Sequence, residues 1–205
     1  MFARAWALLA PCVGADAPRR EMLEGLTGDV LEIGCGEGRN FGLYPPGVRR
    51  VTAVEPEPYL RRLAGIAAGR TPVDITVIAG DAAALPAESG SSDAVVASLV
   101  LCSVPDQAAA LAEIVRVLRP GGELRFFEHV VARQPVAASL QRGLDGSGVW
   151  PRLAGGCHLA RDTAAAIDAS GLVVERLRRV PLGPGRVQVP AVLGVARRSA
   201  TEPSP

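Results

Sequence analysis

The sequence predicts a single α/β domain built around a mainly parallel β-sheet. Its 205 residues correspond to one domain, and 48% apolar with 21% charged residues is the composition of an ordinary globular protein. Short runs of β-branched and other apolar residues alternate with segments of helical periodicity. Because this alternation is typical of βαβ units, it favours parallel strands joined by helices.

Five apolar runs in the first two thirds of the chain are expected to form strands. They cover residues 29–33, 51–54, 75–79, 93–98 and 123–127. Helices are expected between the second and third runs and between the fourth and fifth, over 59–69 and 106–118. The second helix begins at a capping residue, Asp106, and its apolar positions recur at helical spacing until Pro120-Gly121-Gly122 stops it.

The last third of the chain has a different pattern. Residues 133–161 are rich in glycine and alanine and are expected to hold one helix and a loop. A short helix follows Asp162 and ends near Gly171. Runs at 172–180 and 191–196 have no helix between them, which predicts an antiparallel hairpin at one edge of the sheet.

Composition excludes several classes of function. The chain has 22 basic and 21 acidic residues, a net charge of +1, so no overall field draws it to nucleic acid or to anionic lipid. All the basic residues are arginine, which excludes a Schiff-base lysine and a phosphate-loop lysine. No run of 18 apolar residues occurs, so a membrane span is not expected.

The four cysteines, at positions 12, 35, 102 and 157, are widely separated. Without a paired spacing, and with two histidines in the chain, a zinc finger or a dense disulfide framework is not expected. Cys157 and His158 are adjacent, but two neighbouring residues do not supply a tetrahedral site, so no metal is expected. Separated thiols are compatible with a reducing compartment, and we expect a cytoplasmic location.

The stretch Leu31-Glu32-Ile33-Gly34-Cys35-Gly36-Glu37-Gly38 contains the end of the first strand and a glycine-rich turn that follows it. Such a turn lets the backbone approach a ligand, and the N–H groups of a helix entered from it would favour a nucleotide-like molecule. A dinucleotide site requires a glycine at the sixth position of the motif, where this chain has Arg39. The spacing instead suits a ligand with an amino-acid end, whose ammonium group Glu32 could hold. Cys35 is interpreted as a small residue that fits the loop.

Acidic residues follow the next two strands. Glu55 lies about 20 residues beyond the turn, where a carboxylate can accept hydrogen bonds from both ribose hydroxyls, although a surface acid is the alternative. Pro56 can cover one face of an adenine. The third strand ends at Gly80-Asp81-Ala82, where Asp81 could accept the adenine amino group or cap a helix.

These stretches together resemble the class I S-adenosylmethionine-dependent methyltransferases. The matching segments are LEIGCGEG at 31–38, AVEPEP at 53–58, AGDAAALP at 79–86 and RVLRPGGEL at 116–124. The resemblance implies S-adenosylmethionine as cofactor, with S-adenosylhomocysteine as its product. It also implies a Rossmann-like, doubly wound sheet of seven strands in the order 3-2-1-4-5-7-6, with strand 7 antiparallel.

A more specific resemblance, to the alkyl-thiol methyltransferases and their bacterial relatives near the quinone-biosynthesis methyltransferases, covers most of the chain. It is carried by Asn40-Phe41, Tyr44-Pro45-Pro46-Gly47, residues 99–104, Phe127-Glu128-His129-Val130, Trp150, Gly156-Cys157, Leu159 and Arg161. It implies methyl transfer to a small molecule, with sulfur acceptors in the better-known members. The chain departs from that family in lacking a long hydrophobic N-terminal anchor, which argues against stable membrane attachment. It also departs at Glu37, where threonine is common, and at His158.

The single domain, 1–205, is accordingly expected to have four parts. These are an N-terminal helical lid at 1–25, a cofactor-binding core at 29–130, a substrate-side helix and loop at 131–171, and a C-terminal β-hairpin at 172–197.

Residues after the fourth and fifth strands are candidates for the acceptor side, because ligands bind beyond the carboxyl ends of parallel strands. The backbone around Ser98 and Leu99 is expected to face the methionine end of the cofactor. Cys102 and His129 are the candidate acceptor-side groups; His129 could act as a base or bond a loop carbonyl. Glu128 could brace His129 or cap a turn.

Two more residues near the predicted site have expected structural roles. Arg161 is expected to pin a loop more than to bind an anionic acceptor. Trp150 is expected in the loop core or the pocket wall.

Three kinds of function stay open from the sequence. The first is methyl transfer to a small molecule, either to a thiol or as an O-, N- or C-methyltransferase of quinone or secondary metabolism. The second is an NAD-dependent oxidoreductase, which the glycine spacing disfavours, and the third is a non-catalytic cofactor-binding module. We expect no nucleic-acid partner and a monomer or homodimer.

Overall fold

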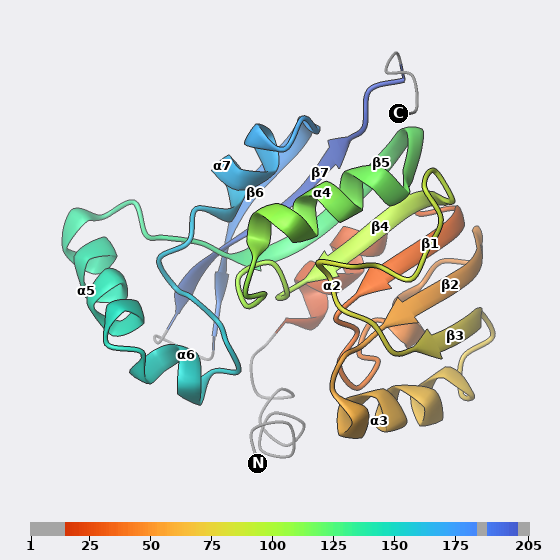
Figure 1. The fold of residues 1–205 in the computed structure, drawn as a ribbon, viewed down its shortest axis with the longest axis horizontal. Coiled ribbons are helices and arrows are strands. Elements are labelled where there is room, and N and C mark those ends of the chain that lie inside the picture. The colour runs from red at the N-terminus through yellow and green to blue at the C-terminus, as the bar shows by residue number, and fades with distance from the viewer. Residues whose placement is uncertain (1–14, 184–187, 201–205) are drawn as a thin grey trace.

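In a computed structural model that describes residues 15–183 and 188–200, seven strands form one mixed sheet (Figure 1). The strands are β1 (Gly28–Ile33), β2 (Val48–Val54), β3 (Asp74–Ile78), β4 (Ser92–Ser98), β5 (Leu118–His129), β6 (Val173–Leu182) and β7 (Val189–Arg197). Their order in the sheet is β3-β2-β1-β4-β5-β7-β6, and β7 is antiparallel to both neighbours. The expected Rossmann-like topology is therefore confirmed.

The helices are α2 (Asp16–Leu23), α3 (Pro58–Ala68), α4 (Gln107–Val117), α5 (Pro135–Gly146), α6 (Val149–Leu153) and α7 (Thr163–Ala169). A short 3-10 helix, η2 (Phe41–Leu43), lies between β1 and β2. The side chain of Asp106 accepts a hydrogen bond from the backbone N–H of Ala109 at 2.9 Å, as expected for the cap of α4. Asp162 caps α7 in the same way, through Ala165 at 3.2 Å.

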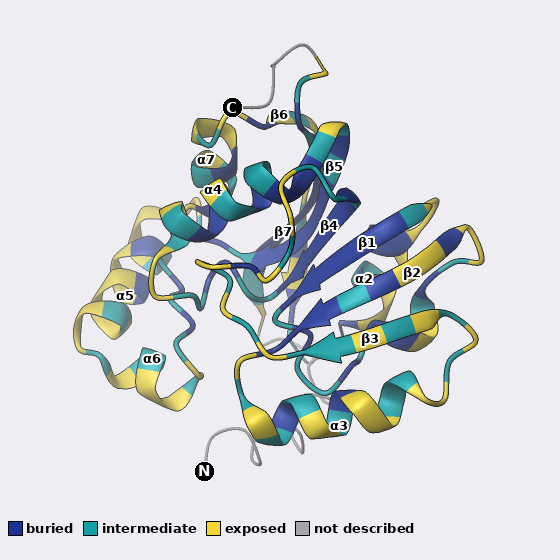
Figure 2. Ribbon diagram, turned by 45° about the vertical axis from the view of Figure 1, so that its right-hand side comes forward, coloured by how far each residue is buried: buried dark blue, intermediate teal, exposed yellow. Residues whose placement is uncertain are grey.

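Both faces of the sheet are covered, because side chains on each strand alternate between the two. Val30 on β1 packs on the face of the sheet that is covered by α2, η2 and α3. Leu31 and Ile33, on the same strand, pack on the opposite face, which is covered by α4 and α7. The central strands β1 and β4 are consequently the most deeply buried (Figure 2). This arrangement leaves the carboxyl ends of β1, β2, β4 and β5 at one edge of the sheet.

Three features differ from the sequence-based expectation. The glycine turn leads into turns and η2, not an α-helix, because Pro45-Pro46 cannot donate the N–H groups that a longer helix needs. Residues 133–161 hold two helices, since Gly148 adopts a left-handed φ of 69° and interrupts them. Strand β5 begins at Leu118, pairing with Ser92 before the register shifts at the Pro-Gly-Gly segment.

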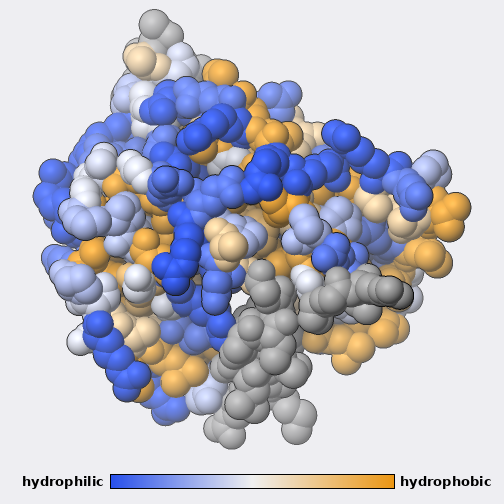
Figure 3. Space-filling view, turned by 180° about the vertical axis from the view of Figure 1, so that it is seen from behind, coloured by the Kyte–Doolittle hydropathy of each residue, from blue (hydrophilic) through white to orange (hydrophobic). Residues whose placement is uncertain are grey.

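The expected lid over residues 1–25 lies partly outside the described residues, and of it only α2 and the segment around it can be placed. In the described part of the chain, no helix has the length and apolarity to span a membrane. Helices α5 and α6 expose apolar residues, and in the view from behind such residues gather on that side of the molecule (Figure 3). The residues are Val136, Leu140, Leu144, Val149 and Leu153.

A buried arginine ties the end of the sheet to the end of α4. Arg198, which is 5% exposed, donates from Nη1 to the carbonyls of Leu118 at 2.6 Å and Val115 at 2.9 Å. These carbonyls belong to the last turn of α4, which has no further helical N–H groups to pair with and carries partial negative charge. The guanidinium therefore satisfies acceptors that would otherwise be buried without a partner.

We predict that Arg198→Met lowers the free energy of unfolding by about 2–3 kcal/mol, because it leaves these carbonyls unpaired. The matched control is Arg178→Met, which removes an exposed arginine paired with the exposed Glu21 and should cost less than about 1 kcal/mol. Urea denaturation followed by circular dichroism measures both. Equal losses for the two variants would contradict the role assigned to Arg198.

Candidate functional site

A cavity of about 310 Å³ opens at the carboxyl ends of the central strands. It runs from the glycine turn after β1 to the loop between α6 and α7. All the residues expected to contact a cofactor line it: Glu32, Gly34, Cys35, Gly36, Glu55, Pro56, Gly80, Asp81, Ala82, Ser98 and Leu99. Cys102 and His129, expected on the acceptor side, line the same cavity. The two halves of the predicted site are thus continuous.

The glycine turn is required by backbone geometry and close packing. Gly34 has a φ of 59°, and a Cβ there would lie 2.6 Å from a methyl of Val100. Gly38 has a φ of 86°, and its Cβ would collide with the ring of Phe41 at 2.7 Å. Gly38 therefore packs against η2, which explains why glycine is needed at the fifth position of the motif.

Glu55 is held as a fixed acceptor at the end of β2. Its Oε2 accepts from the N–H of Gly36 and its Oε1 from the N–H of Glu57, each at 2.9 Å. Burial raises the pKa of Glu55, while these two N–H groups oppose the rise. The carboxylate, 5% exposed, is oriented by backbone on both oxygens before any ligand arrives.

Glu32 lies at the centre of a buried polar network. Its Oε1 accepts from Asn40 at 2.8 Å and its Oε2 from the hydroxyl of Tyr44 at 2.7 Å. Arg19 of α2 donates to the amide oxygen of Asn40 at 2.9 Å and also lines the cavity. Burial raises the pKa of Glu32 to about 7, although both hydrogen bonds and the charge of Arg19 oppose the rise. A cationic group entering the cavity would therefore meet a buried carboxylate.

The residues after β3 have mixed roles. Asp81 lines the cavity, and its Oδ1 also accepts from the N–H of Ala83 at 2.8 Å. The residue thus caps a turn and not a helix, because the described segment between β3 and β4 contains no helix, and it stays at the cavity wall. A Cβ on Gly80 would lie 2.8 Å from both Val54 and Pro86, so a side chain cannot be accommodated there.

The backbone after β4 is strained at a residue that lines the cavity. Leu99 has a φ of 60°, and it is the one residue other than glycine with a positive φ in the described ranges. Its N–H donates to the carbonyl of Phe127 at 2.7 Å. The hydroxyl of Ser98 is buried without a hydrogen-bond partner at the cavity wall. Strain and an unsatisfied polar atom together indicate a place built for a ligand.

Glu128 lies beside the cavity without lining it. Its Oε1 accepts from the N–H groups of Val100 and Leu101, and its Oε2 accepts from that of Cys102. The side chain is fully buried, and burial raises its pKa against these three bonds. Of the two roles expected for Glu128, the structure supports the turn cap. It positions the loop that carries Cys102.

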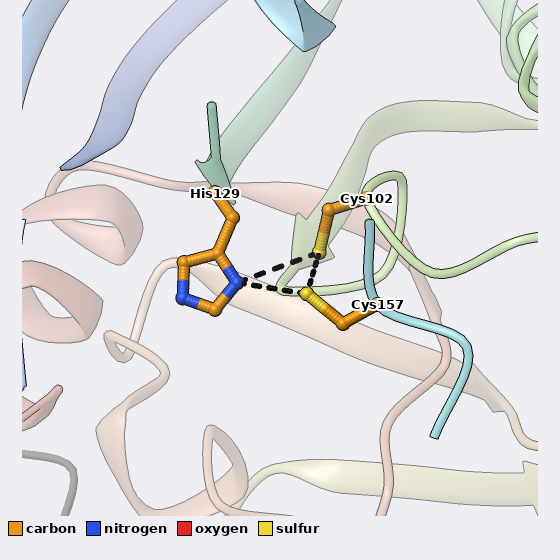
Figure 4. A group of neighbouring side chains, drawn as sticks. All are labelled: Cys102, His129 and Cys157. Atoms are coloured by element: carbon orange, nitrogen blue, oxygen red, sulfur yellow. Dashed lines mark hydrogen bonds between the residues drawn. The ribbon is translucent and has the colours of Figure 1, made fainter. Parts of the chain in front are cut away.

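Cys102, His129 and Cys157 meet at the far end of the cavity (Figure 4). Nδ1 of His129 lies 3.1 Å from Sγ of Cys157 and 3.9 Å from Sγ of Cys102, and the two sulfurs are 3.8 Å apart. Both cysteines are buried free thiols. Contact with Cys157 raises the pKa of Cys102, and contact with Cys102 lowers that of Cys157. The sequence spacing did not indicate this meeting.

The loop that brings Cys157 to the cavity is fixed by backbone contacts. The N–H of His158 donates to the carbonyl of Cys102 at 2.8 Å. A Cβ on Gly156 would lie 2.8 Å from the carbonyl oxygen of Ser103. Arg161 donates to the carbonyls of Leu101 and Val104, at 3.1 and 2.6 Å, which confirms that it pins a loop.

Two other cavity residues differ in how far the sequence indicated them. Trp150 was expected either in the core of the loop or in the pocket wall, and it lines the cavity. Arg19 is a cavity residue that sequence reasoning missed, since an arginine on a short N-terminal helix gives no local sign of burial.

The side chains fit an adenosyl amino acid. Glu55 offers an oriented carboxylate for two neighbouring hydroxyls, and Glu32 offers one for an ammonium group. The unpaired hydroxyl of Ser98 and an unpaired Nε of Arg19 are polar atoms that such a ligand could satisfy. The cavity has no lysine to bind a pyrophosphate, since the chain has none.

Comparison with known proteins agrees with this reading of the site. Residues 31–126 match a family model described as a methyltransferase domain. Thiol S-methyltransferase TMT1B of Homo sapiens is 35% identical over 187 residues, covering 82% of this chain and 76% of that protein. Thiol S-methyltransferase TMT1A of Homo sapiens is 38% identical over 155 residues, covering 74% of this chain and 62% of that protein. The chain therefore spans less than two thirds of the length of TMT1A.

More distant matches extend the same pattern. Ubiquinone/menaquinone biosynthesis C-methyltransferase UbiE of Caulobacter sp. is 37% identical over 118 residues, covering 58% of this chain and 44% of that protein. Among solved structures, the YcgJ protein of Bacillus subtilis has a TM-score of 0.71 at 17% identity, covering 88% of this chain and 96% of that one, which shows the shared fold. The chain belongs to the S-adenosylmethionine-dependent methyltransferases, in the family that includes thiol S-methyltransferases TMT1A and TMT1B.

Proposed function

We propose that this protein transfers a methyl group from S-adenosylmethionine to the sulfur atom of a small thiol. The observation that supports this most directly is the single cavity that joins Glu32 and Glu55 to the cluster of Cys102, His129 and Cys157. Similarity to proteins named thiol S-methyltransferases supports a sulfur acceptor. The cavity volume, about 310 Å³, suits a small molecule.

The acidic half of the cavity would hold the cofactor. Glu55 would accept hydrogen bonds from the two ribose hydroxyls, and Glu32 would face the ammonium group. Pro56 would cover one face of the adenine and Asp81 would accept a hydrogen bond from its amino group. Gly34, Cys35 and Gly36 would form the turn against the methionine end of the cofactor. The remaining wall comprises Gly80, Ala82, Ser98 and Leu99. When bound, S-adenosylmethionine supplies a methyl group activated by a sulfonium. The sulfur that gives up this methyl group leaves as the neutral thioether of S-adenosylhomocysteine.

The other half of the cavity would align the acceptor. Displacement at a sulfonium methyl needs little beyond alignment and exclusion of water, because the leaving group is already good. A thiol has a reference pKa near 8.5 and is partly ionised at neutral pH. His129 is the histidine of the cavity and would take the remaining proton, while Glu128 would hold the loop that places Cys102.

The setting we propose is the cytoplasm, without nucleic acid as a partner. The free thiols at Cys35, Cys102 and Cys157 support a reducing compartment. Several arginines of the described surface are paired with acids, which supports a surface that does not bind phosphate chains.

We predict that the chain methylates small thiols and leaves matched phenols and amines unmodified. The experiment is a screen of these three classes with isotopically labelled S-adenosylmethionine, read by mass spectrometry of the products. Methylation of a phenol, an amine or a quinone carbon in place of a thiol would contradict the proposed acceptor and would support an O-, N- or C-methyltransferase instead. Cofactor binding without any turnover would support a binding module.

We predict that Glu55→Ala weakens S-adenosylhomocysteine binding at least about tenfold, because it removes acceptors for the ribose. The matched control is Glu88→Ala, an exposed acid between β3 and β4 that does not line the cavity. Isothermal titration calorimetry measures both, and NAD should show no comparable binding to the unmodified protein. Equal affinity in Glu55→Ala and the control would remove Glu55 from ribose recognition.

We also predict that S-adenosylhomocysteine binds about tenfold more tightly at pH 8 than at pH 6. In the free protein the pKa of Glu32 is raised to about 7. An adjacent ammonium group lowers that pKa, so the complex holds fewer protons and affinity rises as the pH increases. Calorimetry in buffers of different ionisation enthalpy measures the released protons. In Glu32→Gln binding should be weaker and lack this pH dependence; the same pH slope in that variant would show that another group is responsible.

A further inference from the structure

The three side chains at the far end of the cavity have the spacing of ligands around one metal ion. In a tetrahedral zinc site with Zn–S near 2.3 Å and Zn–N near 2.05 Å, two sulfurs lie about 3.8 Å apart, and a sulfur and a nitrogen about 3.6 Å apart. Here the sulfurs of Cys102 and Cys157 are 3.8 Å apart, and their distances to Nδ1 of His129, 3.9 and 3.1 Å, bracket the second value. The three side chains point toward one another, with the two sulfurs and the ring nitrogen on the inside (Figure 4).

Both sulfurs of this cluster converge on one nitrogen atom, although they also contact each other, and Cys102 contacts the hydroxyl of Ser103 at 3.5 Å. Nδ1 of a neutral histidine offers either one N–H or one lone pair, so it can pair well with one sulfur at a time. Yet both Cys102 and Cys157 approach the same nitrogen. A cation between them would engage all three groups at once, and two sulfurs with one imidazole are the donor set that favours zinc over magnesium or calcium.

The surrounding structure holds the ligands in place without a metal. The carboxylate of Glu128 accepts a hydrogen bond from the N–H of Cys102, and the N–H of His158 donates to the carbonyl of Cys102. The carbonyl of His129 accepts a hydrogen bond from the hydroxyl of Thr163 at 3.4 Å. Each ligand therefore comes from a segment tied to a neighbouring segment, as a preorganised metal site requires.

The geometry points to a zinc-type divalent cation bound by Cys102, His129 and Cys157, with a fourth position open to the acceptor side of the cavity. This inference rests on the proposed function for its role, and it differs from the sequence-based expectation of no metal. Three protein ligands and one open position are the arrangement of catalytic zinc. All three residues line the cavity, so a small thiol entering it can reach the fourth position.

Such a cation would prepare the thiol for methylation. A thiol that coordinates a divalent metal loses its proton, which passes to water, and it stays bound as a thiolate. The thiolate electron pair forms the new carbon–sulfur bond as the carbon–sulfur bond of the sulfonium breaks, and the product thioether, a weaker ligand, can leave. In this scheme His129 acts as a metal ligand, and the cation takes over the role of the base.

The test is metal binding by the full-length, reduced protein after removal of metal with a chelator. We expect a single Co²⁺ per chain, with a sulfur-to-cobalt charge-transfer band and the intense visible bands of four-coordinate cobalt, displaced by Zn²⁺. Excess 2-mercaptoethanol should change the visible bands, because its thiolate enters the fourth position. The reductant is a phosphine, so that no other thiol competes.

Variants separate this site from adventitious binding. Cys157→Ser and His129→Gln should each weaken Co²⁺ binding by more than about a hundredfold, beyond the effect of losing an outer hydrogen-bond partner. The matched controls, Cys35→Ser and His158→Gln, alter residues outside the cluster and should keep the cobalt spectrum. Circular dichroism checks that each variant is folded.

Three outcomes would overturn the inference: no cobalt charge-transfer band in reduced protein, a band that survives Cys157→Ser, or a Cys102–Cys157 disulfide with no metal in protein isolated anaerobically. Metal binding is measured without cofactor or acceptor. Its failure would therefore leave methyl transfer to be judged by the calorimetry and the product screen, and failure of those would leave the metal result standing.

Discussion

The buried carboxylate of Glu128 is the interaction on which the shape of the site depends. It lies at the end of β5 and accepts three consecutive N–H groups, from Val100 to Cys102, across the neighbouring strand end. Burying a carboxylate is costly, and charge-assisted bonds from backbone offset that cost only if the loop keeps this conformation. The left-handed φ of Leu99, just before the loop, is a strain that the three bonds can maintain. Through this single side chain, β5 determines where the end of β4 turns and where Cys102 points.

The opposite end of the cavity follows a different electrostatic principle. Glu32 and Glu55 are both buried carboxylates, and the pKa of each is raised by burial. Glu55 is oriented by two backbone N–H groups, whereas Glu32 is oriented by side chains, Asn40 and Tyr44, that reach it from beyond the glycine turn. A cavity with two incompletely compensated acids is poised for a ligand that carries a positive charge and several hydroxyls. Glu32 is the acid that favours an adenosyl amino acid over a dinucleotide, because both ligands offer ribose hydroxyls to Glu55 but only the first carries an ammonium group.

What the sequence could predict depends on whether the signal was local. Strand and helix positions, and the alignment of Glu55 and Asp81 at one edge of the sheet, follow from periodicity and from the rule that parallel strands end together. The prediction of a helix directly after the glycine turn was wrong. The proline pair that limits helix formation there lies several residues downstream, outside the glycine motif itself. Arg19 was missed since its burial depends on how α2 docks against Asn40, which no short-range pattern encodes.

The cluster of Cys102, His129 and Cys157 shows the limit of spacing arguments most directly. A search for paired ligands near one another in sequence draws attention to Cys157 and His158, yet only Cys157 joins the cluster, whereas the ring of His158 lies 4.0 Å from Asp145. The histidine that does join comes from the end of β5, and its partner sulfurs come from the loop after β4 and from the loop after α6. Parallel strand ends place Cys102 and His129 together for the same reason that they place the cofactor residues together. The loop after α6 adds Cys157, because the N–H of His158 donates to the carbonyl of Cys102. In an α/β sheet, ligands for one ion can therefore be distributed over the whole chain, and the strand ends, with the loops bonded to them, indicate where to look for them.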